Sequence, residues 1–353
     1  MVRTLTLEMV YAGNETISGA LKLMSKRTID IRREAAGQMQ VGTLEEGSIT
    51  GLVEFGDRFL IVKEKAVYEF IMADKIDPDR NNERIPNSQQ RIFKVGSNDP
   101  VIGHTLLTAD TLFNPKFLPD TFDREKAMDA ALRLTNDLVA MRDEQRKLLK
   151  EIEIDVADAA TKPFNSGFAI PAIMDLEPRC KTVVQRADHI TIAVLDIARL
   201  FFGSQITHAD SLSKFAESEF EEEDQFRIFS EQAVPLLRLI RESRNAVEHH
   251  KPAKRAVFAN FQMNSEGKLV RPQFELIHPQ FPQPTTDLVE FFGYLIEELS
   301  TLFETFVALC CGYYAQFDKF IIAVVSQDKA RRRSPHVRYS YALAINGEWA
   351  PLS

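Results

Sequence analysis

Helical periodicity over long stretches of the chain is the feature that most constrains its fold. Between residues 123 and 152, apolar side chains recur at spacings of three, four or seven, and charged residues occupy the other faces. This pattern predicts an amphipathic helix whose apolar stripe must pack on another element. Packing within the chain is favoured, because the repeat is short and Gln145 interrupts it. An intermolecular coiled coil is the alternative.

Three more helices are expected, at residues 180–202, 221–250 and 285–326. Pro235 lies inside the second, so that stretch is either one kinked helix or two helices. The third contains the most apolar window, residues 306–325, which approaches the ~20 residues of a membrane span. Charged side chains lie inside this window, and each costs about 2.5–3.5 kcal/mol near the centre of a bilayer. We therefore expect a buried core helix there.

Short apolar runs at residues 49–55 and 58–62 flank a Gly-Asp dipeptide, which predicts a β-hairpin near the N-terminus. Residues 66–72 would add another strand to it. The stretch 74–90 is polar and longer than most connections in compact domains, so we expect either a functional or a mobile loop. These elements together predict a small α/β unit.

A second hairpin is expected between the helices of the other part of the chain. Residues 257–263 alternate between apolar and polar, and residues 268–277 follow a short turn that contains Gly267. The fold class predicted is therefore α+β and mostly helical, with an N-terminal α/β unit followed by an all-α bundle that carries a β-hairpin insertion. The expected parts are an N-terminal unit at 1–118, a helical connector at 119–162, a helical domain at 163–326 with its insertion at 253–278, and a basic C-terminal tail at 327–353.

Composition limits the environment and the partners. The 353 residues include only 3 Cys, of which Cys310 and Cys311 are adjacent, so neither a disulfide framework nor a C-x-x-C metal half-site is present. The first residues lack the apolar core of a signal peptide, and we expect a cytoplasmic protein. A net charge of −8 argues against a broad nucleic-acid coat but allows a local basic site.

Residues 77–82 begin like a calcium-binding loop, but the pattern fails further on. Asn82 stands where the sharp turn needs Gly, and Ser88 stands where the bidentate Glu is needed. Phosphate-cradling Gly-rich loops, H-E-x-x-H and G-x-S-x-G are absent from the sequence. We therefore predict no metal site and no cofactor.

Residues 241–252 contain the constellation that rises above this background. Arg244 is followed by the polar Asn245 and, after three more positions, by His249, near the expected end of a helix. This spacing resembles the motif of the HEPN superfamily, which lies near the end of a helix in a small helical bundle. The resemblance would cover about residues 164–326. It implies a helical HEPN-like domain.

The resemblance also implies an activity, namely endonucleolytic cleavage of RNA without a metal, by attack of the ribose 2′-hydroxyl on the adjacent phosphate. Such a reaction needs a proton donor or acceptor near neutrality and a fixed cation against the phosphoryl oxygens. His249 would be the acid or base, Arg244 would stabilise developing charge, and Asn245 would orient the phosphate or the catalytic side chains. The expected RNA-binding residues are Arg241, His250, Lys251, Arg331, Arg332 and Arg333.

HEPN proteins commonly work as dimers, so the resemblance implies a homodimer in which two motifs meet. It further implies a toxin or antiviral-defence effector that acts on RNA and has a regulatory or antitoxin protein as a partner. Five residues of a regular helix turn through about 140°, so Arg244 and His249 would diverge unless the helix ends near the motif. Pro252 favours such an ending.

Two other classes remain open. In a noncatalytic binding or assembly module, Arg244 would pair with Glu248 four residues along the helix and His249 would cap the helix end. In a membrane-associated protein, residues 306–325 would form the anchor. The second of these is disfavoured by the charges inside the window.

Overall fold

The computed structural model describes residues 27–34, 40–162, 167–314, 320–324, 334–345 and 348–352. Its contacts divide the chain into two compact units, Met1–Asp99 and Pro100–Ser353, which are taken separately below. The fold is α+β and mostly helical, as the sequence predicts. The division precedes residue 118, because the short helices that follow Asp99 pack against the first long helix of the second unit.

The first unit is built on an antiparallel sheet whose strand order is β1-β2-β3-β4. The hairpin predicted from the apolar runs is confirmed, and Gly56 at its turn has a φ of +53°, a conformation that favours glycine. The fourth strand was not predicted, because its sequence is mostly polar and shows no apolar alternation. The strands are β1 (Ile49–Phe55), β2 (Arg58–Lys63), β3 (Val67–Ile71) and β4 (Ser88–Phe93).

The polar stretch at residues 74–90 contains most of α3 (Ala73–Ile76), a turn that follows this helix, and the start of β4. In the turn, the Asp77 carboxylate accepts hydrogen bonds from the backbone N–H groups of Asn81 and Asn82, both at 2.9 Å. These bonds hold the pKa of Asp77 below its usual value. Both carboxylate oxygens of Asp77 are therefore already used within the turn.

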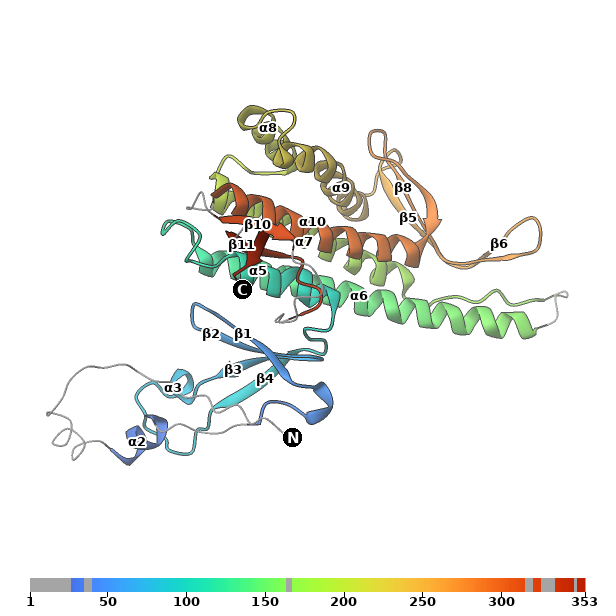
Figure 1. Cartoon of the computed structure of the whole chain (residues 1–353). Helices are drawn as coiled ribbons and strands as arrows, with labels where there is room; N and C mark the ends of the chain where they lie inside the picture. The colour runs from blue at the N-terminus through green and yellow to red at the C-terminus, as the bar shows by residue number, and fades with distance from the viewer. Residues whose placement is uncertain are drawn as a thin grey trace, which may run out of the picture. The chain divides into compact units, whose positions relative to one another are not determined.

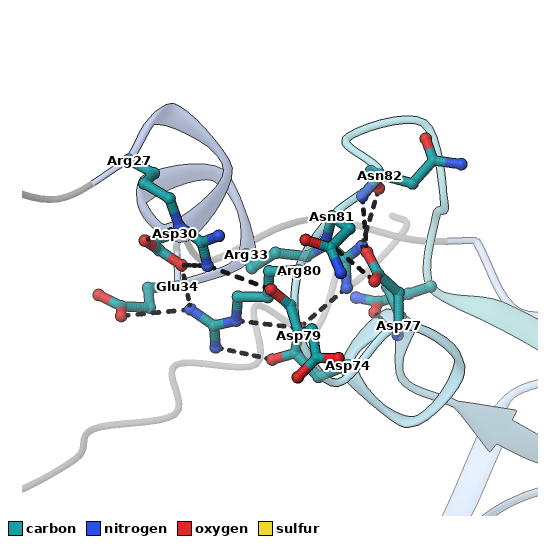
Figure 2. Close-up of polar contacts among 12 residues, drawn as sticks. Arg27, Asp30, Arg33, Glu34, Asp74, Asp77, Asp79, Arg80, Asn81 and Asn82 are labelled. Carbon is teal, nitrogen blue, oxygen red and sulfur yellow. Dashed lines mark hydrogen bonds and ion pairs between the residues drawn. The ribbon is translucent and has the colours of Figure 1, made fainter.

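Ion pairs join this turn to α2 (Thr28–Glu34), as Figure 2 shows. Arg80, which has a φ of +51°, reaches Asp74 at 2.8 Å and the α2 residue Asp30 at 3.2 Å. Arg33 of α2 reaches Asp74 at 2.8 Å. A helix of 7 residues is too short to be stable alone. Ile29 is the buried residue of α2, and one buried side chain gives the helix little stability. The ion pairs therefore hold α2 against the turn.

We predict that Arg80→Gln loosens α2, because the bridge between Asp30 and Asp74 is lost. Backbone amides of residues 29–34 should exchange hydrogen faster than in the wild type, measured by mass spectrometry at low ionic strength. The two proteins should converge at high salt, which screens the pairs. The matched control is Arg84→Gln, an exposed arginine on the same turn. Equal exchange in both variants would contradict the ion-pair account.

We also predict a pH signature for Asp77. Because its pKa is lowered in the folded state, the ionised carboxylate stabilises the fold above about pH 4, and this contribution is lost as the pH falls through the folded-state pKa. Asp77→Asn should therefore lower the denaturation midpoint most above that pH, and the difference from the wild type should shrink in acid. Asp79→Asn, at an exposed neighbour, should show no such dependence.

Long helices form the body of the second unit, and in Figure 1 α6, α7 and α10 run alongside one another. The apolar stripe predicted for α6 is buried within the chain, where α7 and α10 pack on it. Pro235 lies inside a single helix, α9, which settles the choice between one helix and two. The main helices are α6 (Arg124–Thr161), α7 (Leu176–Phe202), α8 (Ala209–Glu219), α9 (Gln225–Glu248) and α10 (Leu288–Tyr314).

Three shorter helical segments precede α6, namely α4 (Pro100–Ile102), the π-helical η2 (Gly103–Leu107) and α5 (Thr108–Leu112). All three pack against α6. A further 3-10 turn, η1 (Leu44–Glu46), precedes β1 in the first unit. Neither α8 nor these short segments was predicted, because their apolar positions are too few to show a period.

The prediction of one helix at residues 285–326 is wrong at both ends. The helix α10 ends at Tyr314, and the apolar window continues as a strand, β10 (Phe320–Val324). Its β-branched residues suit a strand, and pairing with β11 (Tyr339–Ile345) satisfies its backbone. The expected polar tail likewise contains β11 and β12 (Glu348–Pro351), which pair with each other. No helix among the described residues has the length and apolar character that spanning a membrane requires.

The predicted hairpin insertion is confirmed and is larger than expected. In it β5 (Arg255–Ala259) pairs with β8 (Gln273–Ile277), which also pairs with β9 (Gln283–Asp287). The tip is a small ladder of β6 (Gln262–Met263) and β7 (Leu269–Val270). Stacking of Phe274 on Phe291, with ring centroids 4.4 Å apart, fixes the insertion on α10.

Candidate functional site

The candidate site lies at the C-terminal end of α9. This helix begins at Asp224, whose carboxylate accepts the N–H of Phe226 at 2.7 Å, and it buries Leu237, Ile240 and Ala246. The opposite face carries the polar residues of the motif. The helix therefore has a buried apolar face and a polar face.

The helix ends where the motif requires it to end. The last helical residue is Glu248, and His249 follows with φ −122° and ψ 61°, outside the helical region. The N–H of His249 still donates to the carbonyl of Asn245, at 2.8 Å. The side chains of His249, His250 and Lys251 are exposed. The regular rotation that would separate Arg244 from His249 thus stops before the histidine.

A nearly buried carboxylate on α7 lies beside Arg241 and Arg244 of α9. Asp188, whose side chain is 5% exposed, lies 3.0 Å from Arg241 Nη1 and 3.7 Å from Arg244 Nε. Sequence analysis did not single it out. The sequence pattern that could have identified it is a charged residue on the apolar face of a helix, one turn from Val184 and beside Ala187.

Arg244 has a second partner on its own helix, since its Nη2 lies 2.7 Å from Glu248 Oε2. A guanidinium carries five N–H donors, so contacts through Nε and Nη2 leave donors on Nη1 for another acceptor. The Arg244 side chain is 29% exposed, so it is partly accessible from solvent. The arrangement can hold one oxyanion beside a fixed cation.

The insertion contacts α9 at Arg238 and Glu242, before the motif. Arg238 pairs with Asp210 and lies over the Phe281 ring, 5.9 Å from its centroid. Glu242 Oε2 lies 3.2 Å from Nε2 of His278, which is 1% exposed. Nδ1 of this histidine accepts the backbone N–H groups of Gln280 and Phe281, so the proton resides on Nε2. His278 is therefore structural, and the open part of the face is the motif itself.

Part of the basic C-terminal tail lies outside the residues that the structure describes. Arg331, Arg332 and Arg333 lie outside the part of the chain that the structure describes. Arg338, from the same stretch of sequence, donates through Nε to the buried Glu304 at 2.6 Å. Burial raises the pKa of Glu304, and the Arg338 guanidinium acts against that rise. The charge of Arg338 is therefore compensated within the fold.

Neither a metal centre nor a known relative explains the site. Within the described ranges, no group of three or more His, Cys, Asp or Glu side chains is placed to hold a metal ion. No protein-family model matches the chain, and comparisons with curated proteins and with solved structures found no match. The function must therefore be argued from the residues themselves.

We predict that Asp188→Ala lowers the free energy of unfolding by about 1.5–3 kcal/mol, because a buried hydrogen bond to a charged group is lost. Asp210→Ala is the matched control, since it also removes the carboxylate partner of an arginine on α9, in this case Arg238. The Asp210 side chain, however, is 49% exposed. Its cost should stay below about 1 kcal/mol. Urea denaturation measures both values. Equal costs would mean that Asp188 is not the clamp described here.

Proposed function

We propose that the chain is a metal-independent endoribonuclease of the HEPN type, in which Arg244, Asn245 and His249 are catalytic. The observation that carries the proposal is the convergence of Arg241 and the motif residue Arg244 on Asp188, on a helix that ends at the exposed His249. Fixed cations beside a proton-transfer group are what phosphoryl transfer without a metal requires.

The proposed reaction is a transesterification within RNA. The ribose 2′-oxygen bonds to the adjacent phosphorus, and the bond from phosphorus to the 5′-oxygen of the next nucleotide breaks. The 2′-hydroxyl proton passes to a base, and the departing 5′-oxygen takes a proton from an acid. The products carry a 2′,3′-cyclic phosphate and a 5′-hydroxyl. DNA lacks the attacking group and is not cleaved.

The residues divide these tasks by their positions. His249 exchanges the proton, because its imidazole makes no hydrogen bond or ion pair with any other described residue. Arg244 binds the phosphoryl oxygens through its remaining N–H donors, and Asn245 orients the phosphate. Asp188 does not touch the substrate and is a positioning residue that holds Arg241 and Arg244.

The proposal includes a homodimer, in which the motifs of two copies meet, because the resemblance to HEPN proteins implies one. The substrate proposed is RNA. The biological role proposed is that of a toxin or antiviral-defence effector, silenced by a regulatory or antitoxin protein that blocks the motif.

We predict that the purified chain cleaves RNA in excess chelator. His249→Ala should reduce the cleavage rate by roughly 10²–10⁴-fold, the usual loss when a general acid or base is removed. Arg244→Ala should reduce it by roughly 10²–10³-fold, the usual loss when a group that stabilises developing charge is removed. Gel analysis of labelled RNA under single-turnover conditions measures the rates. The control His189→Ala removes another exposed histidine, on α7, and should cleave at the wild-type rate.

Cleavage that needs a divalent metal, or that survives both substitutions, would contradict the mechanism. Circular dichroism should show that the variants keep the wild-type fold. A rate lost equally in His189→Ala would point to a folding defect and not to catalysis.

A noncatalytic binding or assembly module is the second candidate. The pairing of Arg244 with Glu248 at 2.7 Å favours it, because this contact stabilises the helix end without any substrate. That function predicts no RNA cleavage under any condition, together with a change of oligomeric state in Arg244→Ala. Size-exclusion chromatography with light scattering on the same variants distinguishes the two candidates.

A further inference from the structure

The chain makes a tight turn directly after α9. The N–H of Lys251 donates to the carbonyl of Lys254 at 3.1 Å, and the N–H of Lys254 donates back to Lys251 at 3.0 Å. Residues directly opposite in such a pair carry their side chains on the same face. The next residue, Arg255, begins β5. Three cations and two histidines therefore occupy residues 249–255.

These cations differ from the arginines of α9 in what surrounds them. Each of Arg238, Arg241 and Arg244 faces a carboxylate, as described above. The side chains of Lys251, Lys254 and Arg255 make no ion pair or hydrogen bond with any residue that the structure describes. In a chain of net charge −8, this turn thus carries three positive charges within five residues that no described residue pairs.

Helix stabilisation does not account for the whole cluster. A cation near a helix C-terminus interacts favourably with the helix dipole, but that effect falls off within the last turn. Lys254 and Arg255 lie beyond it, since α9 ends at Glu248. Lys254 is also exposed. Another role is needed for these two residues.

We propose that Lys251, Lys254 and Arg255 form a phosphate-binding turn that holds a single-stranded nucleic acid beside His249. The neighbours on the turn are Pro252 and Ala253, which offer no aromatic surface for stacking on bases and no apolar anchor for a bilayer. Binding therefore acts on the phosphate backbone and is independent of sequence. The inference deepens the proposed function, since it names what holds the strand, and neither Lys254 nor Arg255 belongs to the motif.

The test is strand binding by the full chain, measured with fluorescence anisotropy on labelled single-stranded DNA, which the proposed reaction cannot cleave. Wild type and the double variant Lys254→Ala/Arg255→Ala are titrated at several salt concentrations. Each phosphate contact contributes about 0.7 to the slope of log affinity against log salt concentration for single strands. The double variant should lose about 1.4 from that slope and bind more weakly at low salt.

Lys268→Ala is the matched control. This lysine lies in the same insertion, but its charge is paired with Glu266 at 2.8 Å, so its removal should leave the slope unchanged. An unchanged slope in the double variant would overturn the proposal, as would an equal loss in the control. Failure of the wild type to bind at low salt, or binding only to vesicles of anionic lipid, would overturn it as well.

The result separates this inference from the ribonuclease proposal. Strand binding that depends on Lys254 and Arg255, in a chain that never cleaves RNA, supports the binding turn and removes the catalytic function. Cleavage of RNA by the double variant, with strand binding unchanged, supports the ribonuclease proposal and overturns the binding turn. A thermal melt of each variant establishes that the fold is intact.

Discussion

A carboxylate almost sealed from water must be compensated, and the compensation of Asp188 organises the second unit. Its charge is met by Arg241 at 3.0 Å and, farther away, by Arg244 at 3.7 Å. Removing water from a charge is costly unless a partner replaces the water. The contact of Asp188 with the two arginines therefore joins α7 to α9 and also fixes where the arginines lie. The proposed catalytic role of Arg244 depends on it.

The site separates two kinds of positive charge. The arginines on α9 are neutralised, and carboxylates fix their orientation, which suits groups that must stabilise a reacting phosphate. The cations on the following turn are unpaired with described residues and exposed, which suits groups that attract a strand from solution. Orientation and attraction are thus assigned to neighbouring but different residues, within one stretch of chain.

The parts of the fold that local pattern determines could be predicted. The hairpin of β1 and β2, the stripe of α6 and the polar front of α9 each follow from a period visible in the sequence. The strand β10 could not, because pairing with β11 after a long interval overrides the apolar run. Asp188 could not either, since its partner Arg241 is 53 residues away and only packing brings them together.

The most direct test of the central claim is the chemistry of the cut ends. RNA treated with the chain in chelator is analysed by mass spectrometry, beside the same RNA with 2′-O-methyl groups at the cleaved positions. The account predicts 2′,3′-cyclic phosphate and 5′-hydroxyl ends in the first RNA and no cleavage of the second. Ends bearing a 5′-phosphate, or equal cleavage of the methylated RNA, would contradict it.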